Sequence, residues 1–163
     1  MKRFAVVFLV PAIALLAGCR FRTFTDAEGN KATMTRDGDA AEITIEGADG
    51  SEAQIAFSGS GVSLPEALPE DVPIFADATV MGTTVDAETL MVAMQTATQP
   101  EAVIEFYEEQ LPANDWEITD TTRIPQGAFF TASKREERNV HVSVGGVNEG
   151  GTFITITIDM PGN

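Results

Sequence analysis

Strict alternation of apolar and polar residues in the C-terminal half of the chain limits the fold more than any other feature. Three runs show this alternation, and each places three large apolar side chains on one side of an extended backbone. The runs are Leu90, Val92 and Met94; Val140, Val142 and Val144; and Ile154, Ile156 and Ile158. A period of two residues is typical of a strand with one buried face. We therefore expect a sheet whose apolar face is covered by another layer.

Between the first of these runs and the other two, the sequence predicts a single helix. Residues 98–101, Thr-Gln-Pro-Glu, have the pattern of a capping box, in which the threonine and glutamate side chains bond backbone amides of the first turn. From there to Leu111 apolar residues recur every three or four positions, and glutamates occupy the opposite side. We interpret the glutamates as a solvated face, and Asn114 as the left-handed residue that ends the helix.

Turn residues set the order of strands around this helix. Residues 125–127 and 148–151 are short connections of the kind that join antiparallel neighbours, so the last four strands are expected to form a meander. We predict an α+β fold class over residues 79–160: a C-terminal two-layer sandwich of an antiparallel sheet with one helix, in the order ββαββββ. Trp116, just after the helix, is expected to close one edge of the sheet.

The residues before this module show a weaker strand pattern. Acidic turn sequences separate short runs, in which Ile43 and Ile45 share one face of a strand and Ile55 and Phe57 share a face of the next. The apolar side chains are few, so such a meander is only marginally stable by itself. We predict a small acidic N-terminal β-meander arm over residues 19–57, which precedes the sandwich.

A break in composition follows the arm. Serine and glycine alternate over residues 58–61, and Pro65, Pro69 and Pro73 follow at four-residue spacing. Glycine and serine loosen a chain, whereas proline fixes φ and holds an extended path. We predict a linker over residues 58–78; the alternative is a polyproline ligand for another domain.

The N-terminus has the layout of an export signal. Lys2 and Arg3 precede an apolar run of about thirteen residues that contains Pro11 and ends in Leu-Ala-Gly-Cys at residues 16–19. The run is too short for a membrane-spanning helix, which needs roughly twenty apolar residues, and it fits a signal that is removed. The segment resembles the lipobox of bacterial lipoproteins. The alternative is an ordinary secretory signal with an incidental cysteine at Cys19.

The resemblance implies a processing route and a location. The signal peptide, residues 1–18, is cleaved between Gly18 and Cys19, and Cys19 carries a diacylglycerol and often a further acyl chain. Two or three chains hold a protein on a membrane far more firmly than one. The implied location is the cell envelope, and in a cell with two membranes Arg20 favours the outer membrane, facing the periplasm. With Cys19 acylated no thiol remains, so the fold has no disulfide.

A second segment carries a resemblance to the same kind of protein. Residues 68–78, Leu-Pro-Glu-Asp-Val-Pro-Ile-Phe-Ala-Asp-Ala, followed by Phe106-Tyr107, Leu111 and Trp116, resemble a family of uncharacterised bacterial lipoproteins. In that family a proline-punctuated phrase introduces a small α+β module. The chain departs from the pattern at Asp115, because a glycine usually precedes the tryptophan. The family has no assigned activity, so the resemblance implies a location and a fold but no reaction.

Charge narrows the partners that the chain can have. It carries 25 acidic residues against 10 basic ones, a formal net charge of −15. Loss of Lys2 and Arg3 with the signal leaves 8 basic residues against the same 25 acidic ones, and the charge becomes −17. Such a charge repels nucleic acid. We expect no nucleic-acid partner, a membrane contact through the lipid on Cys19, and an envelope protein as the partner.

Few residues have a pattern that points to chemistry. His141, the only histidine, lies on the strand side opposite Val140 and Val142, and neither a nucleophile nor an orienting acid is evident beside it. Met91 and Met94 cannot chelate one metal ion, because residues three apart on a strand point to opposite faces. The chain contains no GxSxG, HExxH or glycine-rich phosphate motif. We expect no catalytic residue, no cofactor and no metal.

The sheet face on the side away from the helix is a candidate interaction surface. It is polar and has one aromatic interruption, and its predicted members are Asn139, His141, Ser143, Phe153, Thr155 and Thr157. Two alternatives remain open for this face. It is either solvated, or it receives the N-terminal arm.

These patterns favour a lipid-anchored cell-envelope protein without catalytic activity, which serves in binding or envelope assembly. The alternative is an acidic protein that binds cations or stores a ligand through the carboxylates of its turns. Those carboxylates are Asp26, Glu28, Asp37, Asp39 and Asp49. A third hypothesis, a hydrolase that uses His141, predicts that His141→Ala abolishes an activity and leaves stability unchanged.

Overall fold

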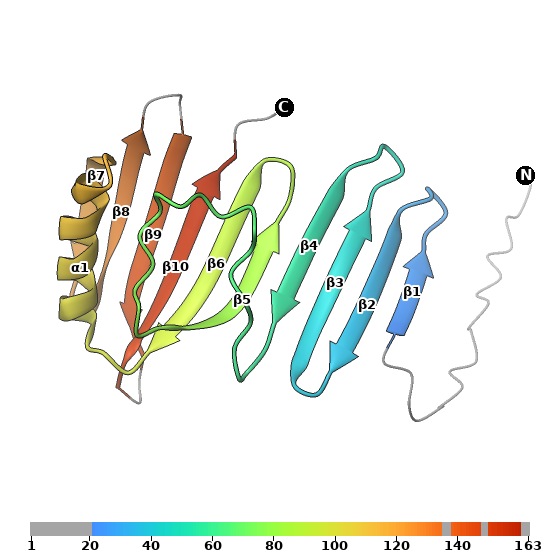
Figure 1. Cartoon of the computed structure of the whole chain (residues 1–163), viewed down its shortest axis with the longest axis horizontal. Helices are drawn as coiled ribbons and strands as arrows, with labels where there is room; N and C mark the ends of the chain where they lie inside the picture. Colours follow the sequence, from blue (N-terminus) through green and yellow to red (C-terminus); the bar gives the residue numbers. More distant parts are fainter. Residues whose placement is uncertain (1–20, 135–137, 148–149, 161–163) are drawn as a thin grey trace, which may run out of the picture.

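A computed structural model describes residues 21–134, 138–147 and 150–160, and within them the chain forms one helix and ten strands, all in a single antiparallel sheet (Figure 1). The elements are β1 (Phe21–Thr25), β2 (Lys31–Asp37), β3 (Ala40–Glu46), β4 (Glu52–Phe57), β5 (Thr79–Val85), β6 (Thr89–Thr96), α1 (Pro100–Ala113), β7 (Glu117–Ile124), β8 (Gly127–Lys134), β9 (Arg138–Gly146) and β10 (Thr152–Asp159). Across the sheet the strands follow the order β1-β2-β3-β4-β5-β6-β10-β9-β8-β7. The predicted signal peptide and Cys19 lie outside the described residues.

The predicted fold class was wrong about the size and continuity of the sheet. We expected a sandwich of six strands with a separate arm in front of it. Instead β4 pairs with β5 from Gln54 opposite Val85 to Phe57 opposite Gly82, so the arm and the module share one ten-stranded sheet. The physical reason is that a strand edge has unpaired backbone groups that seek a partner. The local sequence of β4 does not show that its partner is β5, which follows only after residues 58–78.

The chain reaches the far edge of the sheet through the helix. β6 leads into α1, and α1 leads into β7 at the outer edge, after which β8, β9 and β10 return one by one until β10 pairs with β6. In this register Ile154 lies opposite both Met94 and Val144. The crossover places α1 against β7, β8 and β9, as Figure 1 shows.

The hydrophobic core lies between α1 and the sheet face that it covers. The alternating apolar side chains of β6, β9 and β10 are at most 2% exposed, as their period predicts. β8 and the helix supply most of the remaining core residues: Ala128, Phe130, Ala132, Val103, Ile104, Tyr107 and Leu111. Full burial of one such large side chain contributes roughly 1.5–3 kcal/mol. The helix and these four strands therefore form the most stable part of the molecule.

The N-terminal end of α1 differs from the predicted capping box, which was wrong. The N-cap residue is Gln99, and its side chain makes no capping hydrogen bond. The Thr98 hydroxyl instead accepts a hydrogen bond from the Thr96 hydroxyl at 3.2 Å, and Glu101 accepts one from Arg123 of β7 at 3.1 Å. Thr98 and Glu101 therefore bond side chains of the neighbouring strands instead of backbone amides in the first turn of the helix.

The C-terminal end of the helix also differs by one residue. The left-handed position is Asp115, with φ of 64°, whereas Asn114 has φ of −102°. Asn114 holds the last turn through its side-chain amide, which donates to the Gln110 carbonyl at 2.9 Å. A left-handed backbone favours glycine. Asp115 thus occupies the position at which the resembling family carries glycine.

Residues 58–78, predicted as a linker, pack over the same side of the sheet as the helix. Figure 1 shows this segment crossing in front of β5, β6 and β10. Val72 is buried, and Leu68, Ile74 and Phe75 pack against the core. The Phe75 ring also meets the Phe106 ring edge to face, with centroids 5.1 Å apart. The segment is therefore a second cover for the apolar face.

An ion-pair cluster fixes this segment to the end of the helix. Asp71 binds Lys134 at 2.7 Å and receives two hydrogen bonds from Arg138 at 3.2 and 2.7 Å. Both cations lie over the buried Trp116 ring, whose indole N–H donates to the Asp71 carbonyl at 2.8 Å. The hydrogen bond from Arg138 lowers the pKa of the Asp71 carboxyl, burial opposes this effect, and Lys134 adds to it.

Candidate functional site

The structure places all six residues of the predicted interaction surface on one face of β9 and β10. Thr157 lies opposite His141, Thr155 opposite Ser143, and Phe153 opposite Gly145. This face points away from α1, because the alternating neighbours of these residues fill the core. We call the face of β6, β8, β9 and β10 that is turned away from α1 the polar open face. Its role in binding stays a prediction.

Three further members of the polar open face were not predicted from the sequence. Phe129 lies opposite Ser143, Thr131 opposite His141, and Met91 opposite Thr157. Phe129, Met91 and Phe153 are exposed by 36–47%. The signal was present, since Ala128, Phe130 and Ala132 alternate in the same way as the other buried runs, and the residues between them must point outward.

His141 lies in the middle of this face beside a hydroxyl and a carboxylate. Its Nδ1 is 3.3 Å from the Thr131 hydroxyl, and its Nε2 is 4.0 Å from the Asp159 carboxylate, which also accepts a hydrogen bond from Asn139 at 3.2 Å. These groups do not form an enclosed site, because the His141 and Asp159 side chains are about half exposed on a sheet surface. β9 is paired on both edges, so its amides are engaged in the sheet and cannot stabilise an oxyanion.

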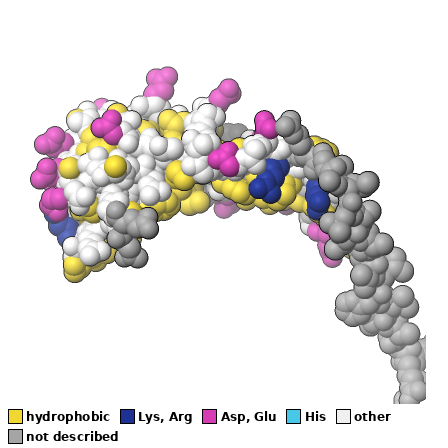
Figure 2. All heavy atoms as spheres, turned by 90° about the horizontal axis from the view of Figure 1, so that it is seen from below, with side chains coloured by type: hydrophobic (Ala, Val, Ile, Leu, Met, Phe, Trp, Pro, Cys, Tyr) yellow, Lys and Arg dark blue, Asp and Glu magenta, His cyan; other side chains and the backbone are white. Residues whose placement is uncertain are grey.

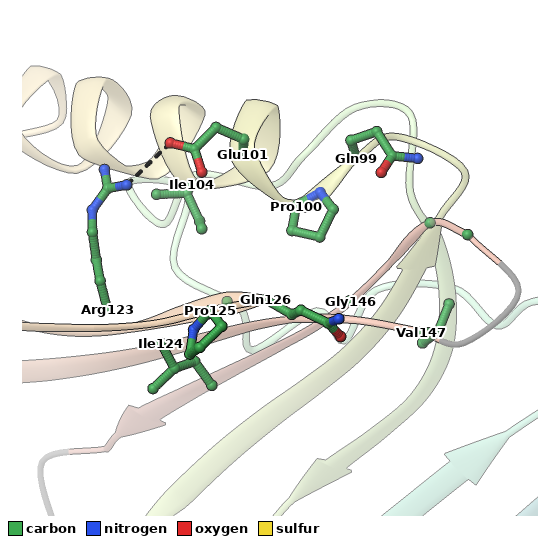
Figure 3. Close-up of a pocket in the computed structure, with 13 residues that line it drawn as sticks. Gln99, Pro100, Glu101, Ile104, Arg123, Ile124, Pro125, Gln126, Gly146 and Val147 are labelled. Atoms are coloured by element: carbon green, nitrogen blue, oxygen red, sulfur yellow. Dashed lines mark hydrogen bonds and ion pairs between the residues drawn. The ribbon is translucent and has the colours of Figure 1, made fainter.

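A pocket of about 360 Å³ lies on the other side of the sheet from the polar open face, next to the start of α1 (Figure 3). It is lined by residues 99–101 and Ile104 from the start of α1, by residues 123–127 from the β7–β8 turn, and by parts of the β9–β10 connection. Figure 3 shows Arg123 reaching up from β7 toward Glu101, and Pro100 and Ile104 facing Pro125 and Gln126. No sequence pattern indicated this pocket, which is built from three segments far apart in the chain.

Arg123 supplies the positive charge at the wall of this pocket. Its guanidinium donates to Glu101 at 3.1 Å and to Glu108 at 2.7 Å. The hydrogen bonds that Arg123 donates to these two carboxylates, with Glu108 contributing most, raise the pKa of Arg123. The two glutamates therefore neutralise Arg123, and the pocket shows neither a free cation among its described lining residues nor a strong preference for an anion.

Asp26 and Asp49 use their carboxylates within their own turns, whereas Asp39 binds two serines that follow β4. Asp26 binds two groups of Asn30 at 2.9 and 2.7 Å, and Asp49 binds Ser51, at 2.6 Å between the side chains. Asp39 binds Ser58 and Ser60, at 3.1 and 2.8 Å. Hydrogen bonds from Asn30, Ser51 and Ser60 lower the pKa values of Asp26, Asp49 and Asp39 respectively.

A metal site is not evident in the part of the chain that the structure describes. Within residues 21–134, 138–147 and 150–160, no group of three or more histidine, cysteine, aspartate or glutamate side chains could hold a metal ion. Met91 is exposed on the polar open face, whereas Met94 is buried in the core. The two thioethers therefore lie on opposite sides of the sheet.

Comparison with known proteins gives one likeness. Residues 78–151, less than half of the chain, match a family model described as START domain-like. No curated protein and no solved structure matches the chain significantly. The matched region contains β5 to β9 with α1, and it includes every lining segment of the pocket. The chain is therefore similar to START domain-like proteins over this region.

The lipoprotein resemblance rests on two segments of the sequence. Its lipobox lies in residues 16–19, outside the described residues. Its second motif has a structural explanation, because Tyr107, Leu111 and Trp116 are all at most 1% exposed in the core. Among the described residues, no helix is long and apolar enough to cross a membrane.

Proposed function

We propose that this protein is a lipid-anchored component of the bacterial cell envelope, without catalytic activity, whose polar open face binds an envelope partner. The observation that carries the proposal is the contrast between the two faces of β6, β8, β9 and β10. One face is covered by α1 and residues 58–78, and the other leaves Phe129 and Phe153 in water around a polar centre. Exposed aromatic residues beside polar groups are typical of protein interfaces.

The lipobox supports the location. A diacylglycerol on Cys19 would hold the folded sheet at a membrane surface, because a single residue of sequence, Arg20, separates Cys19 from β1. The compartment outside the cytoplasm and the charge of −17 left by 8 basic against 25 acidic residues both argue against nucleic acid as a partner.

The geometry around His141 supports a binding role over a catalytic one. A histidine that activates a side-chain nucleophile needs that group within about 3.2 Å, and protection from water helps the charges that develop. The nearest groups here are a threonine hydroxyl at 3.3 Å and a carboxylate at 4.0 Å, on a surface open to solvent. His141 is thus a polar contact residue in this proposal.

Crosslinking in intact cells tests the proposal. A photoreactive amino acid would replace Thr155 at the centre of the polar open face, and a matched probe would replace Glu105 on the exposed side of α1. We expect one envelope protein to be captured from Thr155 and not from Glu105, and to be lost in Cys19→Ala. The same capture from both positions, or no loss of membrane association in Cys19→Ala, would contradict the proposal.

The pocket at the start of α1 supports a second candidate function, the binding of a small ligand. The observation that favours it is the START domain-like match, which spans the complete lining of the pocket. Gln126→Trp would fill the mouth of the pocket from an exposed position, and Thr122→Trp is a control on the other face of the same hairpin. Native mass spectrometry of protein purified from the envelope should detect a bound molecule that Gln126→Trp loses and Thr122→Trp retains.

A further inference from the structure

The first four strands form an amphipathic layer, and one of its two faces is not covered by any other part of the described chain. Register places Phe24, Met34, Ile43, Ile45, Ile55 and Phe57 on one face, through the pairs Met34–Ile43 and Ile43–Ile55. The pair Phe57–Gly82 shows that this face is turned away from α1 and residues 58–78. We call it the arm face.

Charged side chains are sorted between the two sides of this layer. Arg22 lies opposite Met34 and Arg36 lies opposite Ala41, so both arginines belong to the arm face. All carboxylates within β1 to β4 belong to the other side, and they are Asp37, Glu42, Glu46 and Glu52. Figure 2 shows hydrophobic side chains along the hollowed side of the molecule, with basic side chains beside them.

Such a face requires a cover. Four of its six large apolar side chains, Phe24, Met34, Ile45 and Phe57, are exposed by 37–61%. Soluble proteins rarely leave a contiguous apolar patch of this kind in water, and a larger patch marks a contact with a protein or a membrane. A second copy of the chain is a poor cover, because two arm faces would bring four arginines together without a carboxylate on either face.

The position of the lipid attachment site favours a phospholipid surface, instead of a second copy of the chain, as the cover of the arm face. Cys19 is two positions before Phe21, and an extended chain spans about 3.3–3.6 Å per residue, so a lipid there keeps the first residue of β1 within about 7 Å of the attachment site. A protein of this negative charge is repelled by anionic headgroups unless it presents its basic side. The arm face is that side, and its apolar residues suit the interface between headgroups and acyl chains.

We propose that the arm face lies on the phospholipid surface to which Cys19 is anchored, with Arg22 and Arg36 at the headgroup phosphates. This inference rests on the lipid anchor of the proposed function. In this orientation the carboxylates of β1 to β4 face the aqueous side. The membrane then completes the second layer that the N-terminal part of the sheet lacks.

Depth-dependent quenching tests the proposal on the protein purified with its own lipid. It would be reconstituted into vesicles of phosphatidylethanolamine and phosphatidylglycerol that contain a brominated phospholipid. A fluorophore would be attached at Met34→Cys on the arm face or at Thr33→Cys on the opposite side of the same strand. We expect strong quenching at position 34 and little at position 33. Arg22→Glu with Arg36→Glu should remove the difference, whereas Lys31→Glu, on the other face, should not.

A second measurement tests the contact between the arm face and the membrane independently of the lipid on Cys19. Without its lipid, the Cys19→Ser chain should still bind the same vesicles weakly, and Arg22→Glu with Arg36→Glu should weaken that binding at least thirtyfold, at about 1 kcal/mol per basic residue. Intact mass reports the acyl chains on Cys19. An acylated protein with equal quenching at 33 and 34, or a dimer that buries position 34, would overturn the inference and leave the anchor standing. An unacylated Cys19 would overturn both.

Discussion

The two ends of the ten-stranded sheet have the same alternation of apolar and polar residues, but they bury their apolar side chains to very different extents. In β6, β8, β9 and β10 the inward large apolar side chains are at most 2% exposed, because α1 and residues 58–78 form a second layer. In β1 to β4, whose residues are all described, the alternation has the same period of two residues, but Ala41 is the only side chain of these strands that is buried. Alternation therefore makes a face apolar, but a covering layer decides whether that face becomes a core.

Truncating one isoleucine at each end of the sheet should give the largest difference in stability between the two ends. Ile156 of β10 is fully buried, so Ile156→Ala should lower the free energy of unfolding by about 3–4 kcal/mol. Ile43 of β3 is only half-buried, and Ile43→Ala should cost about 1 kcal/mol. Urea denaturation measures both values. Equal losses would show that the arm face is covered in the purified protein.

Removing the charge of Asp71 should separate residues 58–78 from the sheet that they cover. Asp71→Asn weakens the bonds to Lys134 and Arg138, and we expect a loss of about 1–3 kcal/mol in the free energy of unfolding. Asp77→Asn is the matched control, because Asp77 is exposed in the same segment. A loss from Asp77→Asn as large as that from Asp71→Asn would contradict a specific role for the cluster.

The same pair of variants gives a pH dependence with a defined sign. The pKa of Asp71 is lower in the folded protein than its unfolded value of about 3.9, mainly through Arg138. Its contribution is therefore complete above about pH 4 and is lost as the pH falls through the folded pKa. Acid titration of stability should show a shallower fall for Asp71→Asn than for the native protein or Asp77→Asn.

A smaller gain in stability is expected at the end of the helix. Asp115 adopts a left-handed backbone that glycine adopts without strain, so Asp115→Gly should add about 0.5–1 kcal/mol. Asn114→Gly is the comparison variant, and it should destabilise because Asn114 has a negative φ and caps Gln110. Thermal unfolding distinguishes the two. A gain from Asn114→Gly would indicate that the helix ends elsewhere in solution.

Calcium should have the smallest effect. The carboxylates of Asp26 and Asp49 already accept hydrogen bonds within their own turns, and that of Asp39 accepts one from Ser60. We expect no saturable heat in calorimetry with calcium and no rise in melting temperature. Saturable binding that stabilises the protein would instead support the cation-binding alternative.

Several parts of the fold followed directly from local patterns, whereas the pairings between distant segments did not. The buried faces of β6, β9 and β10 were predictable, because strand geometry sends alternate residues to opposite sides. The capping box was not realised, because Arg123 of β7 offers Glu101 a stronger charged partner than a backbone amide. Nothing in residues 58–78 shows by itself that Asp71 meets Lys134 and Arg138 more than sixty positions later.

The candidate sites divide in the same way. Six residues of the polar open face could be placed together because they lie on two alternating strands, and Phe129 carried the same signal. The pocket at the start of α1 could not, because its walls come from three separate segments. The arm face was also hidden, since Ile43 and Ile55 become neighbours only when the register between β3 and β4 is known.

The sequence by itself determined which residues alternate, where one helix must lie and the strong negative charge, because these depend on composition and on neighbours a few positions away. Tertiary structure alone decided that β4 joins β5, that residues 58–78 cover the core and that the arginines of β1 and β2 share a face with the apolar side chains. Those outcomes depend on which distant backbone edges and side chains meet, and that is settled only when all the layers pack together.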